Sequence, residues 1–121
     1  MRTPSIPPAR KPLSLPVIYI LLALAEGDRH GYAIKQTVEE RTGGSIRLGP
    51  GTLYEAIQRL EDTGLIGERG MRAAAVNGQE AQRRYYSLTE RGWAALQAEI
   101  RQLDQVVAQA RRNPRLRKGL A

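Results

Sequence analysis

The side chains able to do chemistry in this chain are few, and their types suit binding better than catalysis. The sequence contains one histidine, His30, and no cysteine, which excludes thiol nucleophiles, disulfides and thiolate zinc sites. A lone histidine does not make a dependable metal site, and no paired-carboxylate motif offers general acid–base chemistry. The Gly-Pro-Gly segment at residues 49–51 lacks the GK[ST] ending of a phosphate loop. We therefore expect no enzymatic activity, no cofactor and no metal site.

Polar side chains gather on one face of a segment that begins at Pro50. Its apolar residues recur at helical spacing and predict a buried face made of Leu53, Ile57 and Leu60. The opposite face carries Thr52, Glu55, Gln58, Arg59 and Asp62. Gln can pair with adenine and Arg with guanine, while Thr52 and Tyr54 near the helix start can bond phosphates. The pattern is typical of a DNA-recognition helix, and an ordinary solvated surface is the alternative for each residue.

A second basic group lies on two predicted strands. Arg83 and Arg84 stand beside two tyrosines on one strand, and Arg69 and Arg72 stand on the facing strand. A projecting basic ribbon can lie along the minor groove or the phosphates. Alternatively, Arg84 pairs with nearby Glu68, an exposed ion pair that adds little stability. The full set of candidate DNA-binding residues is Lys35, Gly51, Thr52, Tyr54, Gln58, Arg59, Arg72, Arg83 and Arg84.

The basic charge of the chain lies at its two ends. The formal net charge is +7. Residues 1–12 and 111–121 carry eight basic side chains and no acidic one, whereas residues 13–110 hold 11 basic and 12 acidic residues. Such ends either bind phosphates without sequence preference or act as solubilising disordered tails. We predict a flexible basic arm over residues 1–12 and a basic tail over residues 113–121.

Periodicity and turn residues divide the rest of the chain into elements. Apolar spacing predicts three helices, over residues 13–25, 30–42 and 50–64. In the third helix, Thr52 and Glu55 are expected to form a capping box. Residues 65–72 and 82–89 predict a two-stranded hairpin. Their connection, residues 73–81, contains the turn dipeptide Asn77-Gly78 but is long for a tight hairpin, so we expect it to be mobile at its tip.

The last predicted helix has the most regular apolar pattern. It follows Thr89, a good N-cap, and ends at Asn113-Pro114. The spacing alternates between three and four residues, which is a heptad seam formed by Trp93, Leu96, Ile100, Leu103, Val107 and Ala110. A second copy of the same helix is the simplest cover for such a stripe, so we predict a homodimer. The alternative is packing against its own domain.

The order of elements predicts the fold class. The predicted order is helix, helix, short extended piece, helix, two-stranded ribbon and helix. This is the order of a winged helix-turn-helix, in which the later of the two central helices lies in the major groove of DNA. We predict a mainly α protein with a small β-hairpin wing and a C-terminal dimerisation helix. Residues 13–89 form the winged-helix domain and residues 90–112 the dimerisation helix.

Three stretches of the sequence resemble the PadR-like family of transcriptional regulators. They are His30-Gly31-Tyr32-Ala33-Ile34, then residues 50–66 with Pro50-Gly51-Thr52-Leu53-Tyr54, Arg59-Leu60-Glu61 and Gly64-Leu65-Ile66, and finally residues 83–92 with Arg83-Arg84-Tyr85-Tyr86-Ser87-Leu88-Thr89-Glu90 and Gly92. The similarity spans about residues 13–110. It implies a short-form winged-helix regulator that dimerises through its last helix, aided by the first. It also implies a double-stranded, palindromic DNA operator, usually a repressor role and, in some members, release by a small-molecule effector.

Two departures from the family pattern limit what carries over. The stretch 73–78 (Ala-Ala-Ala-Val-Asn-Gly) is longer and more apolar than the usual wing tip, which puts DNA contacts there in doubt. Some short members bind flat aromatic drugs between tryptophans near the middle of the last helix. The one tryptophan here, Trp93, lies at the start of that helix, so we expect core packing rather than a drug site.

Some features of the sequence also occur in other kinds of protein. A winged-helix scaffold can serve as a protein-interaction module, and basic ends can coat nucleic acid without specificity. The apolar run 13–25 follows basic residues, as in a signal peptide, but Pro16 and Tyr19 interrupt it. At thirteen residues it is shorter than the ~20 needed to span a bilayer. We therefore predict a cytoplasmic protein with no membrane partner.

Overall fold

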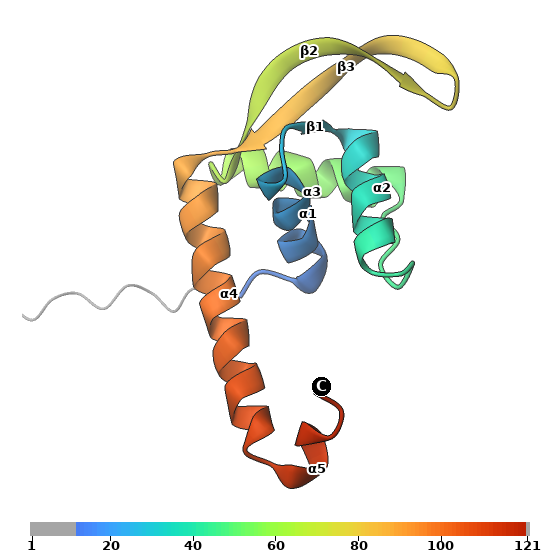
Figure 1. The fold of residues 1–121 in the computed structure, drawn as a ribbon. Coiled ribbons are helices and arrows are strands. Elements are labelled where there is room, and N and C mark those ends of the chain that lie inside the picture. Colours follow the sequence, from blue (N-terminus) through green and yellow to red (C-terminus); the bar gives the residue numbers. More distant parts are fainter. Residues whose placement is uncertain (1–11, 121) are drawn as a thin grey trace, which may run out of the picture.

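The computed structural model describes residues 12–120 as five helices and one small sheet (Figure 1). The elements are α1 (Leu15–Ala25), β1 (Arg29–His30), α2 (Gly31–Arg41), α3 (Pro50–Asp62), β2 (Ile66–Val76), β3 (Gln79–Leu88), α4 (Glu90–Arg111) and α5 (Pro114–Arg117). Helices α1 to α3 lie together beneath the sheet, and α4 runs down one side and continues past the domain. The predicted fold class is confirmed. The predicted basic arm lies outside the described residues except for Pro12.

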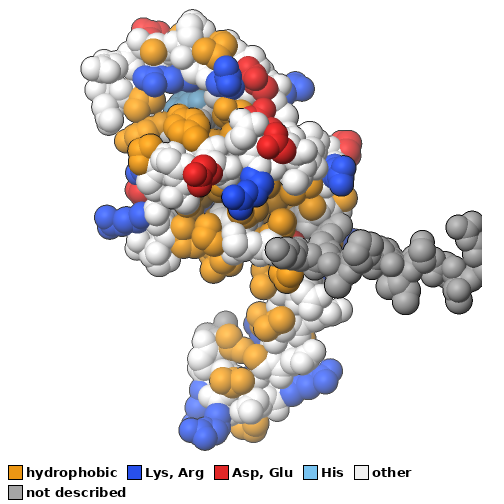
Figure 2. Space-filling view, turned by 180° about the vertical axis from the view of Figure 1, so that it is seen from behind, with side chains coloured by type: hydrophobic (Ala, Val, Ile, Leu, Met, Phe, Trp, Pro, Cys, Tyr) orange, Lys and Arg blue, Asp and Glu red, His pale blue; other side chains and the backbone are white. Residues whose placement is uncertain are grey.

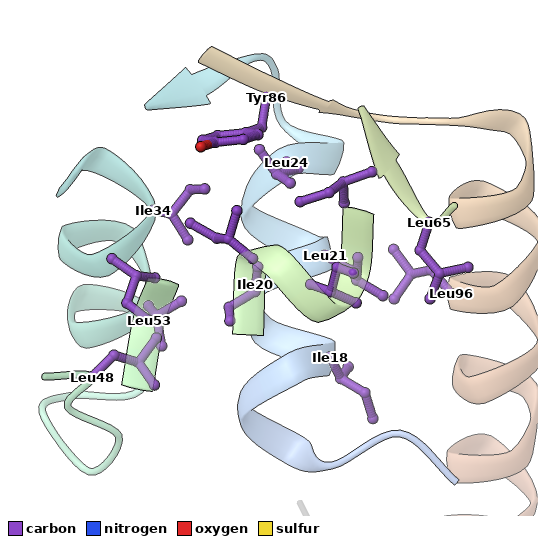
Figure 3. Packing of buried hydrophobic residues seen from close by; sticks show 14 of the residues in the cluster. Ile18, Ile20, Leu21, Leu24, Ile34, Leu48, Leu53, Leu65, Tyr86 and Leu96 are labelled. Atoms are coloured by element: carbon purple, nitrogen blue, oxygen red, sulfur yellow. The ribbon is translucent and has the colours of Figure 1, made fainter. Parts of the chain in front are cut away.

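The core forms where α1 meets the apolar faces of its neighbours. Ile20, Leu21, Ile34, Val38 and Ile57 are the largest fully buried side chains and come from α1, α2 and α3. Figure 3 shows the same cluster extended by Tyr86 of β3 on the sheet side and, beside Leu65, by Leu96 of α4. Each buried aliphatic side chain of this size contributes about 1.5–3 kcal/mol by leaving water. The core therefore joins every major element of the domain.

The helix starts follow local sequence, with one correction. Thr89 accepts a hydrogen bond from the amide of Gly92 at 3.0 Å, so its predicted role as the N-cap of α4 is confirmed. The predicted capping box of Thr52 and Glu55 is wrong. Helix α3 begins one residue after Gly49, Pro50 occupies its first position, and no side chain caps it. Because proline already supplies the helical φ there, the helix starts too early for Thr52 to act as a cap.

The hairpin is longer and tighter than the sequence suggested. Strand β2 continues to Val76 and β3 begins at Gln79, so the prediction of a long connection over residues 73–81 is wrong. Asn77 and Gly78 have φ values of 52° and 77° and form a two-residue turn. Both central residues of such a turn need positive φ, which Asn-Gly tolerates well. Alanine has low strand propensity, and pairing across the ribbon overrides that local preference.

A third strand and a bulge shape the base of this wing. The sheet order is β1-β3-β2, with Arg29 paired to Tyr86 and His30 to Tyr85. The two-residue β1 carries no sequence signal and was not predicted. The register of β2 shifts between Glu68 and Met71, which marks an irregularity that bends an antiparallel ribbon.

Helix α4 is fixed to the domain through its first turn. The Thr89 hydroxyl donates to the carbonyl of Gly64 at 2.6 Å, and the Thr89 amide donates to the carbonyl of Leu65 at 3.2 Å. A Cβ built at Gly92 would overlap with the Leu65 carbonyl oxygen. Glycine is therefore required here so that α4 can approach the start of the wing. None of the described helices is both long and apolar enough to cross a bilayer.

We predict that Gly92→Ala destabilises the protein although alanine favours a helix. The new methyl group would force α4 away from Leu65, and overpacking of this kind costs about 1–3 kcal/mol. Gly51→Ala in the first turn of α3 is the matched control, because a Cβ there meets nothing within 4 Å. Urea denaturation should show a lower unfolding free energy for the first variant alone. Equal stability of the two variants would disprove the tight docking of α4.

Candidate nucleic-acid interface

Helix α3 presents a polar outer face because its apolar inner face is buried in the core. Leu53, Ile57 and Leu60 are buried, whereas the residues of the predicted polar face are all exposed, namely Thr52, Glu55, Gln58, Arg59 and Asp62. Figure 2 views the molecule from behind and shows acidic and basic side chains interspersed over the upper part of the molecule. The Gln58 amide donates to the Asp62 carboxylate at 3.0 Å, one turn further along the helix. The predicted division of the helix into two faces is confirmed.

Tyr54 joins α3 to the start of α2. Its side chain is 56% exposed, and its hydroxyl would lie 3.2 Å from a Cβ placed at Gly31. Glycine at position 31 thus lets the tyrosine ring lie across the first turn of α2. Lys35, further along α2, pairs with Glu39 at 2.8 Å and lies 5.8 Å from the centre of the Tyr32 ring. An acid of its own helix therefore partly neutralises this predicted DNA contact.

His30 is the N-cap residue of α2. Its Nδ1 atom accepts a hydrogen bond from the Ala33 amide at 3.2 Å, and its ring meets Tyr85 edge-on at 5.3 Å. Burial lowers the pKa of His30, and the nearby positive charge of Arg83 lowers it further. Within residues 12–120 no three metal-ligating side chains come together. A neutral imidazole suits this position because only the unprotonated nitrogen can accept the amide hydrogen.

The four wing arginines have different partners. Arg72 pairs with Asp28 at 3.1 Å and covers the Tyr85 ring at 4.5 Å, while Arg69 lies 3.9 Å from the same carboxylate. Arg84 pairs with Glu68 at 3.2 Å, as the alternative interpretation of the sequence anticipated. Arg83 forms no ion pair with any described residue, although its guanidinium donates to the Gln79 carbonyl at 3.3 Å.

The fold brings some of the predicted residues together and separates others. Tyr54, Gln58 and Arg84 line an open hollow of about 290 Å³ between α3 and the wing, together with Met71. Arg59 lies elsewhere on α3, in a hollow shared with the start of α1. Asp28 was not predicted, since a lone acid in the turn after α1 shows no partner in the sequence.

The predicted dimerisation residues divide into two groups. Leu96 is only 4% exposed and packs in the core of its own chain. For this residue the alternative prediction, packing against its own domain, is confirmed. Trp93, Ile100, Leu103 and Val107 are between 36% and 41% exposed, so the predicted core packing of Trp93 is incomplete, and Ala110 is partly buried. Every residue from 100 to 109 is exposed, including Val106, which was not predicted. The lower half of α4 therefore carries an uncovered apolar stripe.

A polar helix beside a projecting ribbon, on a three-helix scaffold, defines a winged helix-turn-helix DNA-binding protein. The family comparison agrees with this class. Residues 20–98 match the Transcriptional regulator PadR-like family, and the chain belongs to that family. It is a DNA-binding transcriptional regulator and not an enzyme. The match ends before most of the apolar stripe on α4, short of the 13–110 range that the sequence motifs suggested.

Relatives and solved structures support the same assignment. An uncharacterised protein of Lysinibacillus sphaericus is 34% identical over 87 residues, covering 72% of this chain and 76% of its own. The transcriptional regulator YqjI of Escherichia coli is 25% identical over 112 residues. A transcriptional regulator from Clostridium thermocellum superposes with a TM-score of 0.65 at 26% identity, covering 82% of this chain and 89% of the other. Bacillus subtilis PadR, solved in complex with operator DNA, superposes with a TM-score of 0.55 at 25% identity.

Several of these relatives are longer than this chain. The matched part covers 85% of this chain but 50% of YqjI, and 69% of this chain but 45% of the Bacillus PadR chain. A transposon protein of Streptomyces fradiae matches at 51% identity over 47 residues, which are 39% of this chain and 13% of that protein. This chain therefore corresponds to about half or less of these longer proteins.

We predict that acid weakens the fold through His30. Because burial lowers its pKa in the folded state below the ordinary value of 6.5, its contribution is present above pH 6.5 and is lost as pH falls. His30→Asn keeps an oxygen acceptor for the Ala33 amide but cannot titrate. Unfolding free energies measured between pH 7.5 and pH 5 should fall more steeply for the native protein than for the variant. Parallel pH profiles would contradict the prediction.

Proposed function

We propose that the protein is a dimeric repressor that binds a palindromic operator. The observation that carries this proposal is the uncovered apolar stripe on α4, because two-fold pairing of this helix would present two copies of α3 to DNA. The two recognition helices would then address half-sites about one helical turn apart, roughly 10 base pairs from centre to centre. Such a regulator acts in the cytoplasm, where bacterial DNA lies.

Base recognition is assigned to the middle of α3. Gln58 and Arg59 are exposed in the third turn of α3, and side chains of these types can reach base edges in the major groove. The Asp62 carboxylate orients the Gln58 amide, leaving its oxygen free to accept from a base. Gly51 and Thr52 at the start of the helix bring backbone and hydroxyl groups close to phosphates.

The wing is proposed to contact DNA at its base and not at its tip. Residues 73–82 contain one charged side chain, Glu80, and the rest of the ribbon tip is apolar or amide. Arg83 and Arg84 stand just below it, while Arg72 is neutralised by Asp28. Phosphate contacts from the base would position the protein without reading sequence.

The dimer is proposed to form through the lower half of α4. This part of α4 extends beyond the rest of the domain (Figure 1). Its apolar side chains are 36–55% exposed, namely Ile100, Leu103, Val106 and Val107. A monomer would leave this stripe in water, and pairing would remove apolar area at about 25 cal/mol per Å². Leu15 of α1 is 53% exposed and would add to the interface.

We include in the proposal that a small molecule releases the protein from DNA, because two hollows lie where residues 12 and 13 meet α4. One of about 340 Å³ is lined by Pro12, Ala98, Glu99 and Gln102, and another of about 230 Å³ includes Leu13 and Ala95. The first is at the lower end of the usual size of small-molecule sites. A molecule that separated the 12–14 segment from α4 would alter the angle between the paired domains.

A second candidate is non-specific coating of nucleic acid, which the C-terminal charge favours. Arg111, Arg112, Arg115, Arg117 and Lys118 are all exposed around α5, and Figure 2 shows Lys and Arg side chains at this end. Binding of a labelled promoter fragment, with and without competitor DNA at several salt concentrations, separates the candidates. Specific regulation predicts a surviving preferred site, whereas coating predicts loss with salt and no preference. A protein-interaction module predicts no DNA binding.

We predict that Arg59→Ala relaxes base preference within each half-site. Loss of an arginine–guanine contact costs about 1–3 kcal/mol of discrimination at that position. Arg101→Ala is the control, because Arg101 is equally exposed but lies on α4. Binding to a library of half-site variants should show a flattened preference at one position for the first variant alone. An unchanged operator profile would refute a base contact by Arg59.

We predict that Leu103→Asp separates the dimer and weakens operator binding. The substitution places a carboxylate inside the proposed apolar seam, where an unpaired charge is strongly unfavourable. Gln105→Asp adds the same charge on the opposite side of α4 and is the matched control. Light scattering should give a monomer for the first variant and a dimer for the second. A Leu103→Asp variant that stays dimeric would place the interface elsewhere.

A further inference from the structure

A small hollow lies where the start of α2, the start of α3 and the base of the wing meet. It measures about 60 Å³, and its lining includes His30, Gly31, Tyr32, Tyr54, Arg83 and Arg84. Pockets for small organic ligands measure about 300–1,000 Å³, so this one is too small for such a ligand. Its volume corresponds to about two water molecules at ~30 Å³ each. The hollow therefore suits a single compact polar group.

Arg83 is one of the lining residues, and its guanidinium donates a hydrogen bond to the Gln79 carbonyl at 3.3 Å. Its Nε atom is shielded from solvent and has no hydrogen-bond partner among the described residues. A shielded donor without a partner costs free energy, and such groups often mark the position of a missing ion or ligand. The guanidinium also lacks an acidic partner within residues 12–120, unlike Arg69, Arg72 and Arg84. Arg83 is thus the wing arginine whose charge remains available.

The other groups around the hollow favour an anion. The Tyr54 hydroxyl lies against Gly31, beside the first turn of α2, where main-chain amides lack helical partners. The positive end of the α2 dipole adds to the charge of Arg83. Arg84 also lines the hollow, although Glu68 neutralises part of its charge at 3.2 Å. His30 is held in its neutral form by burial and by Arg83, and its capping nitrogen is occupied by Ala33.

We propose that this hollow binds one backbone phosphate of the DNA, held by the Arg83 guanidinium and the Tyr54 hydroxyl at the start of α2. The inference rests on the DNA-binding function and assigns one contact within it. Both donors suit phosphate, since arginine offers a planar fork and a hydroxyl adds a single hydrogen bond. A phosphate shared by α2, α3 and the wing would fix the depth at which α3 enters the groove. Arg83 and Tyr54 are therefore positioning residues for base recognition.

The first experiment compares duplex binding by Arg83→Gln, Tyr54→Phe and the double variant at several salt concentrations. Loss of one charged phosphate contact should weaken binding about tenfold, as for a hydrogen bond to a charged group, and reduce the salt slope by about one. Tyr54→Phe should weaken binding severalfold with an unchanged slope. The double variant should lose less than the product of the two, because both residues hold the same phosphate. Arg83→Lys should restore the slope but only part of the affinity.

Two controls make the result specific. Arg69→Gln removes a wing arginine already paired with Asp28, and Arg101→Gln removes an exposed arginine of α4. Both should change the affinity by less than twofold. Circular dichroism melting curves of all variants should coincide, so that weaker binding is not caused by unfolding.

A second experiment locates the phosphate on the DNA. Single phosphates of the duplex are replaced in turn by uncharged methylphosphonates. The native protein should lose affinity at one particular position in each half-site, and Arg83→Gln should be insensitive at that position. The proposal is overturned if Arg83→Gln binds as tightly as the native protein, if its loss equals that of Arg101→Gln, or if the losses of the double variant multiply. Because a phosphate contact does not depend on sequence, the variant series can also be run on any duplex, which separates failure of this site from failure of operator specificity.

Discussion

The packing of the apolar face of α3 against α1 and α2 is the constraint on which the rest of the structure depends. Leu53, Ile57 and Leu60 are each at most 5% exposed, so α3 has one possible rotation about its axis. That rotation leaves Gln58 and Arg59 on the outside. A slip of the helix by one residue would turn polar side chains into the core at a cost of several kcal/mol. Recognition chemistry at the surface is thus set by hydrophobic burial underneath.

Electrostatic pairing within the domain decides which basic residues remain available for DNA. The central part of the chain is nearly neutral, and several of its acids are placed against arginines or lysines. Asp28 forms an ion pair with Arg72, Glu39 with Lys35, and Glu68 with Arg84. These exposed pairs contribute little stability, but they reduce the charge offered to phosphates. The number of basic residues in the domain is therefore larger than the number of positive charges available to DNA phosphates.

Helix α4 serves two environments along its length. Its first turns are part of the domain core, where Leu96 is buried and Gly92 permits close approach to Leu65. Beyond residue 99 the helix leaves the domain, and the same apolar spacing continues while residues 100–109 are all exposed in the part of the chain that the structure describes. A single regular pattern in the sequence thus corresponds to an internal contact at one end and an uncovered surface at the other. Spacing alone shows neither where the domain ends nor which residues it buries.

The sequence by itself determined the order of the four long helices and the two wing strands, the two faces of α3 and the family, because periodicity and capping act over a few residues. It also determined that Asn77-Gly78 would form a turn, although the length of the wing around it was decided by pairing between strands. Only the tertiary structure decided that Asp28 would meet Arg72, that Tyr54 would lie against Gly31 at the start of α2, and that Tyr54 and Arg83 would line the same hollow. These contacts join residues distant in the chain, and their geometry follows from the packing of whole elements against one core.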